Sequence, residues 1–332
     1  MAEVTTIRRR RQAKANLGPT LHDVARAAGV SSASVSRALT RPELVSEAVQ
    51  DRVKSAIRTL AYVPNAAAQA LSGRRSRLVG AVVPALDDPV TALALEWLTR
   101  ELAAGGVALI LSLAGEGAGA SEECVRGLVA RGAEAIVFGA GATPVDPGSL
   151  YPELKLPCAS LDEAAASGAS ARSGFDRAKA LALGARYLQQ LGHRRIGLFA
   201  MGGDHCVGAV RSALAGTGID VVGGSDALDH WRTLPAPPTA LICGSDAAAV
   251  ALLHECSRRE IAVPEQWSVI GFGDTELSRL VRPALTTLRV PAREAGRALA
   301  RNLLALLEGR SEAPAELLAK LVARESTAAP RA

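Results

Sequence analysis

The sequence predicts an N-terminal all-α unit followed by an α/β body in which parallel sheets form two lobes. Apolar residues recur at helical spacing over residues 20–64, whereas short apolar strands alternate with amphipathic helices from Leu78 onward. The chain has 332 residues, of which 48% are hydrophobic and only 3% aromatic. This length suffices for two or three domains whose cores consist mostly of Ala, Val and Leu.

Residues 20–64, called the headpiece below, are expected to form three helices. Small polar residues cap the first turn of a helix, and Gly or Pro ends one. A Gly-containing turn between the first two helices, followed by a third, is the helix-turn-helix arrangement. The expected limits are Thr20 with Asp23, Gly29, Ser31, Arg41-Pro42, Ser46 and Pro64, and the inner faces are Val24, Ala25 and Ala28, then Val35, Ala38 and Leu39, then Val49, Val53, Ile57 and Leu60.

The charge is unevenly distributed along the chain. Residues 1–77 hold fourteen Lys or Arg and five Asp or Glu, a net +9, which leaves −4 for the other 255 residues. A disordered basic tail over residues 1–18 accounts for Arg8 to Arg11 and Lys14, but the remaining basic residues lie in patterned sequence. One basic end on a slightly acidic body predicts a polyanionic partner for that end.

The second headpiece helix presents mainly short side chains on its outward face. Ser32, Ala33 and Ser36 would let the helix backbone approach the floor of a DNA major groove, where longer side chains would hold it away. Arg37 could reach a base edge, and guanine is its natural bidentate partner. The alternative is a solvated helix face on which small polar residues are harmless. Together with the charge and the three-helix pattern, this face favours DNA.

The body alternates strands and helices, which predicts parallel sheets with helices on both faces. In this class, ligands bind at the carboxyl ends of the strands. Expected strands are 78–84, 107–113, 134–139, 158–162, 195–200, 239–243, 267–273 and 285–290, and expected helices include 91–104, 121–131, 177–191, 246–260 and 291–308.

Cysteines and apolar segments exclude several classes of protein. The five cysteines are scattered without CxxC pairing, so we expect buried reduced thiols, no metal site and no cofactor. No apolar segment follows the Arg-rich start, and the longest apolar run, GVALILSLAG, is too short to span a bilayer. A cytoplasmic, nucleoid-associated protein without membrane partners is therefore expected.

The stretch TLHDVARAAGVSSASVSRALTRPELVSEAVQDRVKSAIRTLAYVPNAAAQALSG resembles the headpiece of LacI/GalR-type bacterial repressors almost position for position. The DVA run, the AGVS turn, the VSR triplet, YVPN and the A-Q-x-L hinge are all present. Further along, SRLVGAVVP, LGHRRIGLFA, PTALICGSD, VPEQWSVIGFGDTEL, RPALTTLRVP and LVARESTAAP resemble the family's regulatory domain, which is periplasmic-binding-protein-like. About nine-tenths of the chain is covered.

The resemblance implies roles in DNA binding. One departure is Thr40, where the family usually has Asn, and it weakens one expected contact. Base contacts would come from Ser32, Ala33 and Arg37 in the second helix, within a DNA-binding set of Thr20, Leu21, Ser31, Ser32, Ala33, Ser34, Ser36, Arg37, Asn65, Ala68 and Leu71. In this set Thr20, Ser31, Ser34 and Asn65 would hold phosphates, Leu71 would be a minor-groove wedge, and Ala68 would let two hinge helices approach.

The resemblance also implies the domain limits. Residues 1–18 would be a disordered basic tail, 19–64 the helix-turn-helix domain and 65–76 a hinge helix and linker. The hinge is too short to be helical alone, so DNA and a partner hinge would fold it. Residues 77–332 would be the effector-binding and dimerisation domain, with an N-lobe of about 77–176 plus 291–319 and a C-lobe of about 177–290 plus 320–328.

The resemblance implies an effector pocket between the lobes, but the sequence indicates its contact residues less clearly than those of the DNA-binding surface. Asp162 and Asp246 match frequent polar contacts of the family, and Asp88 and Asp176 are weaker candidates. The alternative for each is a helix N-cap at a strand–helix junction. The further candidates are Cys206, Trp231 and Asp274. The family often has Arg at or near position 206, and core packing explains Trp231 equally well. At position 273 the family usually has Asp where this chain has Gly, although Asp274 remains.

These features predict a homodimeric transcriptional regulator of the repressor type that binds a pseudo-palindromic operator and responds to a sugar-like or other small-molecule effector. The reduced polar set of the pocket suggests an unusual effector, or none. A ligand-binding protein without a DNA role is the first alternative, and the intact headpiece argues against it. A nucleotide-using enzyme is the second, but MGGDHCVG is not GxGxxG, and we expect no catalytic residues.

Overall fold

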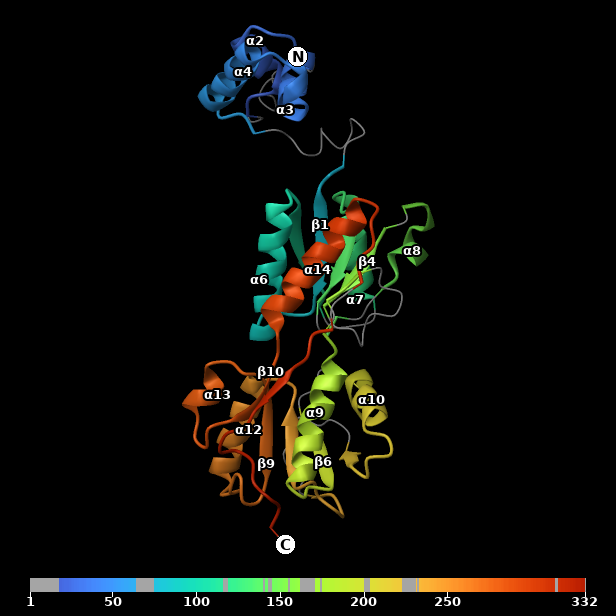
Figure 1. Cartoon of the computed structure of the whole chain (residues 1–332), viewed down its shortest axis with the longest axis vertical. Helices are drawn as coiled ribbons and strands as arrows, with labels where there is room; N and C mark the ends of the chain where they lie inside the picture. The colour runs from blue at the N-terminus through green and yellow to red at the C-terminus, as the bar shows by residue number, and fades with distance from the viewer. Residues whose placement is uncertain are drawn as a thin grey trace, which may run out of the picture. The chain divides into compact units, whose positions relative to one another are not determined.

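The chain forms two compact units, Met1–Ser76 and Arg77–Ala332. Figure 1 shows the computed structural model. The residues that it describes are 18–63, 75–115, 119–139, 141–142, 145–154, 156–161, 171–173, 175–199, 204–222, 231, 233–313 and 316–331.

The headpiece contains helices α2 (Leu21–Ala28), α3 (Ser32–Thr40) and α4 (Glu47–Leu60), with a 3-10 turn, η1 (Pro42–Leu44), before α4. Thr20 and Asp23 form a reciprocal capping box at the start of α2. Gly29 ends α2 at φ 64, a left-handed conformation that favours glycine. These limits confirm the expected helices and their order.

The three helices enclose a small apolar core. Each helix contributes the face that the sequence predicts, although Ala38 and Leu39 of α3 and Val49, Ile57 and Leu60 of α4 are only partly buried. Ser46 precedes α4 as expected, but its side chain makes no capping hydrogen bond. The buried residues are Val24, Ala25, Ala28, Val35, Val53, Ala56 and Tyr62.

The first sheet of the body has five parallel strands in the order β2-β1-β3-β4-β5. The interior strand β1 buries nearly every residue, whereas β2 lies at the edge and keeps much of its length exposed. The strands are β1 (Leu78–Val83), β2 (Ala108–Leu113), β3 (Ala135–Phe138), β4 (Cys158–Ser160) and β5 (Ala171–Arg172), and the connecting helices are α6 (Pro89–Ala104), α7 (Ala120–Ala130), α8 (Pro147–Leu150) and η2 (Pro152–Leu154).

The second sheet has six strands in the order β11-β10-β9-β8-β6-β7. All neighbours are parallel except β10 and β11, which run antiparallel. The strands are β6 (Arg195–Phe199), β7 (Asp220–Val222), β8 (Ala240–Cys243), β9 (Ser268–Gly273), β10 (Thr286–Arg289) and β11 (Lys320–Val322), with helices α9 (Arg177–Gln190), α10 (Asp204–Ala213), α12 (Asp246–Arg258) and α13 (Leu277–Leu280).

The chain returns from the second sheet to the first through helix α14 (Ala292–Leu307), which follows β10 and lies beside α6 (Figure 1). The two helices approach so closely that a Cβ atom on Gly296 would overlap the carbonyl oxygen of Ala94. After α14, Leu317 bridges to Phe175, and the chain then forms β11. The body therefore passes repeatedly between its two sheets, and these passages border the pocket described below.

All eight predicted strands and the five named body helices are present, with limits that differ by up to two residues. The sequence did not predict β5, β7 or β11, which have two or three residues each and are too short for a detectable alternation. It also missed the short helices α8 and α13 and the ten-residue helix α10.

No helix within the described residues is long and apolar enough to cross a membrane. Of the cysteines in this part of the chain, Cys124, Cys158, Cys243 and Cys256 form no disulfide. Burial raises the pKa of Cys256 to about 11, and burial likewise raises the pKa of Cys243. Both thiols are thus protonated and unreactive near neutral pH.

We expect Gly296→Ala to destabilise the body by roughly 1–3 kcal/mol, because the added methyl group forces α14 away from α6. Urea unfolding followed by circular dichroism, at one protein concentration, measures the change. Gly208→Ala in α10 is the matched control, since a Cβ there meets nothing within 4 Å. The control should be neutral or more stable by up to about 1 kcal/mol. Equal effects of both substitutions would contradict the close approach of α6 and α14.

Candidate DNA-binding surface and effector pocket

The first turn of α3 is organised by its own serines. The Ser31 hydroxyl oxygen accepts a hydrogen bond from the Ser34 backbone N–H at 3.1 Å, and the two hydroxyl oxygens lie 2.9 Å apart. Ser31 is exposed and Ser34 is half-buried. The predicted phosphate-binding hydroxyls therefore sit together at the positive end of a helix, a position that favours anions.

The outward face of α3 matches the prediction. Ala33 and Arg37 are exposed and Ser32 and Ser36 are half-buried, while Val35 on the opposite face is fully buried. The only long side chain among the four outward residues is thus a cation. A helix with this face can lie deep in the major groove and still extend one guanidinium group toward a base edge.

Thr20 and Leu21 occupy positions set by helix α2. The Thr20 hydroxyl donates to the Asp23 carboxylate at 2.7 Å, and Leu21 packs against the headpiece core. The hydrogen bond from Thr20 lowers the pKa of Asp23, which also pairs with Arg26 at 3.3 Å. The Thr20 hydroxyl is thus already used in the capping box. A phosphate contact from Thr20 remains a prediction.

Sequence reasoning missed His22, whose Nδ1 atom lies 2.9 Å from the Ser32 hydroxyl oxygen. This contact joins the start of α2 to the predicted DNA-facing side of α3. The sequence indicated only that His22 lies in the first turn of a helix that Thr20 caps. Thr40, the departure noted above, donates its hydroxyl to the Ser36 carbonyl oxygen at 2.7 Å. The predicted hinge residues Asn65, Ala68 and Leu71 lie outside the described residues.

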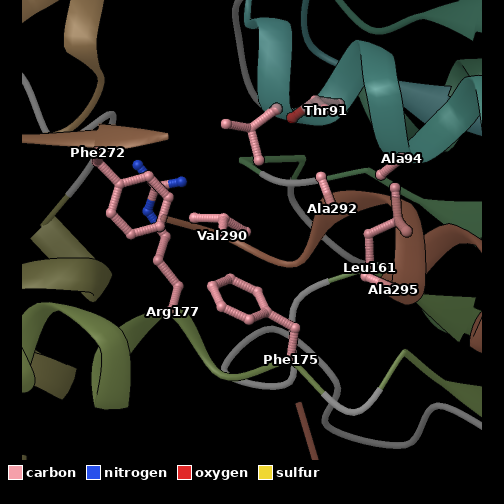
Figure 2. A pocket seen from close by; sticks show the side chains of 10 residues that line it. Thr91, Ala94, Leu161, Phe175, Arg177, Phe272, Val290, Ala292 and Ala295 are labelled. Atoms are coloured by element: carbon pink, nitrogen blue, oxygen red, sulfur yellow. The ribbon is translucent and has the colours of Figure 1, made fainter. Parts of the chain in front are cut away.

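A pocket in the body lies where α6, α9, α14 and the end of β9 meet, close to the passages between the two sheets. Figure 2 shows its lining side chains, most of which are apolar. The pocket has a volume of about 30 Å³, which is room for one or two water molecules. Its lining consists of Val90, Thr91, Ala94, Leu161, Phe175, Arg177, Phe272, Val290, Ala292 and Ala295.

Arg177 is the charged member of this lining, and the sequence did not identify it. Its guanidinium carbon lies 4.2 Å from the centre of the Phe272 ring, and one of its N–H groups donates to the Gly244 carbonyl oxygen at 2.5 Å. Phe175 packs at a tilt against Phe272, with 6.4 Å between ring centres. Arg177 follows the N-cap Asp176 at a helix start, so no pattern distinguished it from an ordinary surface residue.

Asp246 is buried and bonded within the protein. Its carboxylate accepts hydrogen bonds from the Thr275 backbone N–H at 2.6 Å, the Thr275 hydroxyl at 2.9 Å and the Thr287 hydroxyl at 2.5 Å. The N-cap of α12 is Ser245 rather than Asp246, so the alternative interpretation of Asp246 as a cap is wrong. The carboxylate links three segments near the pocket but does not line it.

Asp274 lies at the centre of an arginine cluster. Its carboxylate, 2% exposed, accepts hydrogen bonds from Arg324 and from Arg289 at 2.6 Å, and Arg279 lies 3.8 Å away. Burial alone would raise the pKa of Asp274, but the hydrogen bonds and charges of Arg324 and Arg289 outweigh it and lower the pKa. The cluster ties the loop after β9 to β10 and to the C-terminal segment.

The other effector candidates are dispersed. The Asp88 carboxylate caps α6 through Val90 and Thr91, and the Asp176 carboxylate caps α9, so the structure bears out the N-cap interpretation of both. Trp231 is fully buried in a separate apolar cluster. Asp162 lies outside the described residues, as does the side chain of Cys206. In the described part of the chain, no group of three or more His, Cys, Asp or Glu could hold a metal ion.

Comparison with known proteins yields a family match in each unit. Residues 20–65 match the bacterial regulatory proteins of the lacI family, and residues 185–327 match the periplasmic binding protein-like domain. The HTH-type transcriptional repressor CytR of Escherichia coli is 28% identical over 349 residues, covering 95% of this chain and 98% of CytR. The chain belongs to the LacI family. It is thus a DNA-binding transcriptional regulator and not an enzyme.

Further relatives agree with this membership. The ribose operon repressor of Escherichia coli is 27% identical over 297 residues, covering 83% of this LacI-family chain and 89% of that repressor. A Lac repressor dimer bound to operator and the anti-inducer ONPF superimposes with a TM-score of 0.75 at 24% identity, covering 94% of this chain and all of that one. A CelR–cellobiose complex has a TM-score of 0.61 at 25% identity, over 93% and 99%. The predicted fold class, a helical headpiece plus two α/β lobes with parallel sheets, is confirmed.

Gly273 stands where the LacI-family resemblance led us to expect Asp, and the backbone explains the difference. Its φ is 131, a value that side-chain-bearing residues rarely adopt, and a Cβ there would lie 3.0 Å from a Val90 methyl carbon. An aspartate at this position would strain the backbone and crowd the pocket wall. The pocket of this LacI-family chain thus has no carboxylate at that point.

We expect Asp274→Asn to lower the free energy of unfolding by roughly 2–4 kcal/mol at pH 7, since three arginines lose their buried counter-charge. The folded-state pKa is lowered, so the stabilisation is present above about pH 4 and is lost as the pH falls through the folded pKa. Denaturant unfolding of both proteins at several pH values measures this.

Asp220→Asn, which breaks an exposed pair with Arg195, is the control and should cost under about 1 kcal/mol. The difference between the wild type and Asp274→Asn should shrink below about pH 4. A difference that stays constant down to pH 3 would contradict the ionised state of Asp274.

Proposed function

We propose that this regulator binds a pseudo-palindromic operator as a homodimer, and that a small molecule in the pocket between the lobes controls its affinity for DNA. The repressor function of the relatives CytR and the ribose operon repressor supports repression as the direction of control. The absence of a membrane-crossing helix among the described residues agrees with a cytoplasmic, nucleoid-associated protein without membrane partners.

The observation that carries this proposal is the face of α3. Its outward residues are short except for Arg37, so the helix can enter the major groove far enough for base contact. Ser32 and Ala33 would face bases together with Arg37. Ser31 and Ser34 would bind backbone phosphates at the helix start, and Thr20, Leu21 and Ser36 would complete the surface.

Contacts beyond α3 rest on the family resemblance. Asn65 would bind a phosphate, and Leu71 would insert into the minor groove beside its copy from the second subunit, which unstacks a base step and kinks the duplex. Ala68, small enough for a close approach, would lie where the two hinge segments meet. These segments would become helical only on DNA, which makes their folding the step that an effector can oppose.

The edge strand β2 supports the homodimer. It lies at the end of its sheet, and Ile110, Leu111 and Leu113 expose 37%, 43% and 57% of their surface. Leu86 and Leu93 add exposed apolar area at 47% and 37%. An edge strand with this much apolar surface invites pairing. A second copy of the chain would cover it and place one recognition helix in each half-site.

The pocket is suited to controlling DNA affinity because its walls come from both sheets' helices and from the passages between them. A ligand that favours one spacing of the lobes over another would shift the hinge equilibrium. Coupling of about 1–3 kcal/mol, typical of allostery, changes occupancy roughly 5- to 150-fold. Asp162 and Cys206 remain candidate effector contacts.

The proposed operator can be tested by selection. Genomic fragments are incubated with the full chain, retained at about 150 mM salt and sequenced, so that non-specific binding is largely screened. The retained fragments should share one palindrome of about 14–20 base pairs. Fragments without a shared palindrome would contradict operator recognition by a dimer.

Arg37→Ala should weaken binding to the selected operator by roughly 1–3 kcal/mol and relax the preference at one base pair, because a bidentate contact to guanine is lost. Binding to the operator and to its single-base variants, measured by fluorescence anisotropy, provides the test. Arg26→Ala, which removes an exposed charge paired with Asp23, is the matched control and should leave the base preference unchanged. An equal loss for Arg37→Ala on every sequence would mean that Arg37 contacts only phosphate.

A further inference from the structure

The pocket between the lobes offers few polar groups for a polyhydroxylated ligand. Among its ten lining residues, all within the described part of the chain, only Thr91 and Arg177 carry a polar side chain. A sugar needs several hydrogen-bonding partners around its ring, since an unmatched buried hydroxyl is costly. The rest of the lining is aliphatic or aromatic and suits an apolar molecular body.

Two carboxylates near the pocket, in the part of the chain that the structure describes, are engaged within the fold. Asp88 accepts from the N–H groups of Val90 and Thr91 and from the Thr91 hydroxyl. Asp246 is bonded to Thr275 and Thr287. Rotating either carboxylate toward a ligand would leave its present donors unsatisfied.

The remaining electrostatic character of the pocket is positive. Arg177 supplies a guanidinium group, and none of the described lining residues is acidic. Thr91, Arg177 and Ala292 lie in the first turns of α6, α9 and α14, so three helices begin around this space. Asp88 and Asp176 cap two of these helices, but α14 follows Pro291, whose side chain cannot accept a hydrogen bond. Helix starts and a guanidinium group both favour an anion.

We propose that the effector is a small monocarboxylate with an apolar, aromatic or branched body. Its carboxylate binds the Arg177 guanidinium group, and its body lies against Phe175, Phe272 and Val290. Figure 2 shows the Arg177 guanidinium group against the Phe272 ring, with Val290 and Phe175 among the neighbouring lining side chains. This inference rests on the proposed effector site and narrows its ligand class from metabolites in general to apolar acids.

Binding of a whole ligand requires the pocket to widen, because its volume of about 30 Å³ suits only one or two water molecules. Displacement of Arg177 would widen it, since its guanidinium group stacks on the Phe272 ring and donates to the Gly244 carbonyl oxygen. A carboxylate offers the Arg177 guanidinium group two oxygens with a negative charge, so that two parallel hydrogen bonds can form, whereas the Gly244 carbonyl oxygen is a single neutral acceptor. Ligand binding would thereby change how α9 contacts β8 and β9.

The test is isothermal titration calorimetry on the full-length dimer with benzoate, phenylacetate and isovalerate. Benzamide, phenylacetamide and isovaleramide are the neutral counterparts, and ribose and cellobiose are the polyol probes. We expect at least one acid to bind roughly tenfold or more tightly than its amide and than either sugar, as one charge-assisted pair implies. This comparison uses the unmodified protein, so it does not depend on the folding of a variant.

Two variants then test whether the Arg177 guanidinium group binds the ligand carboxylate. Arg177→Gln should weaken binding of the acid roughly tenfold or more, with little effect on the amide, and Arg177→Lys should retain part of the affinity. Arg186→Gln, an exposed position on the same helix outside the pocket lining, is the matched control and should bind the acid as the wild type does. Sugars binding more tightly than every acid, no acid binding, or acid binding that is unchanged in Arg177→Gln would overturn the ligand class.

Operator binding, measured separately with the selected palindrome, keeps the two proposals distinguishable. Acid binding without any change in operator affinity would refute effector control but leave the ligand class intact. Operator affinity that responds to ribose or cellobiose, and to none of the acids, would retain effector control and overturn the ligand class.

Discussion

The buried Asp246 carboxylate is the interaction on which the pocket wall depends. Its hydrogen bonds from Thr275 and Thr287 join the start of α12 to the loop after β9 and to β10. Gly271 and Gly273 flank Phe272 on the adjacent strand, and a Cβ on Gly271 would overlap the Asp246 carboxylate. The absence of side chains at both positions lets the strand end lie against the carboxylate. Phe272 is thereby fixed as the surface on which Arg177 stacks.

The two units use the same residue types for different purposes. In the headpiece, serine hydroxyls and one long cation face outward, where a polyanion can meet them. In the body, threonines and aspartates bond to one another, and an arginine lies over an aromatic ring at an apolar pocket. A polar residue near a pocket is therefore weak support for a ligand contact until its present hydrogen bonds are known. Asp246 and Asp274 illustrate the point, because both are fully engaged within the fold.

The sequence was sufficient for the features that repeat. Helical stripes in the headpiece and the alternation of β1, β3, β8 and β9 with helices persist over enough residues to be recognised. The two- and three-residue strands β5, β7 and β11 have no such period, because their positions depend on neighbours distant in the chain. Arg177 was missed for a related reason. Its contacts are the Gly244 carbonyl oxygen and the Phe272 ring, which lie 67 or more residues away in the sequence. The choice between cap and ligand contact for Asp88 and Asp176 likewise required atomic positions.

A crystal structure of the full-length dimer on its selected operator, determined at a resolution that places side chains, tests the central claim most directly. It should show the first turn of α3 in the major groove, with Arg37 at a base edge and Ser31 and Ser34 near phosphates. Asp246 should remain bonded to Thr275 and Thr287. An α3 helix that faces solvent, or contacts only the DNA backbone while another element reads the bases, would contradict it.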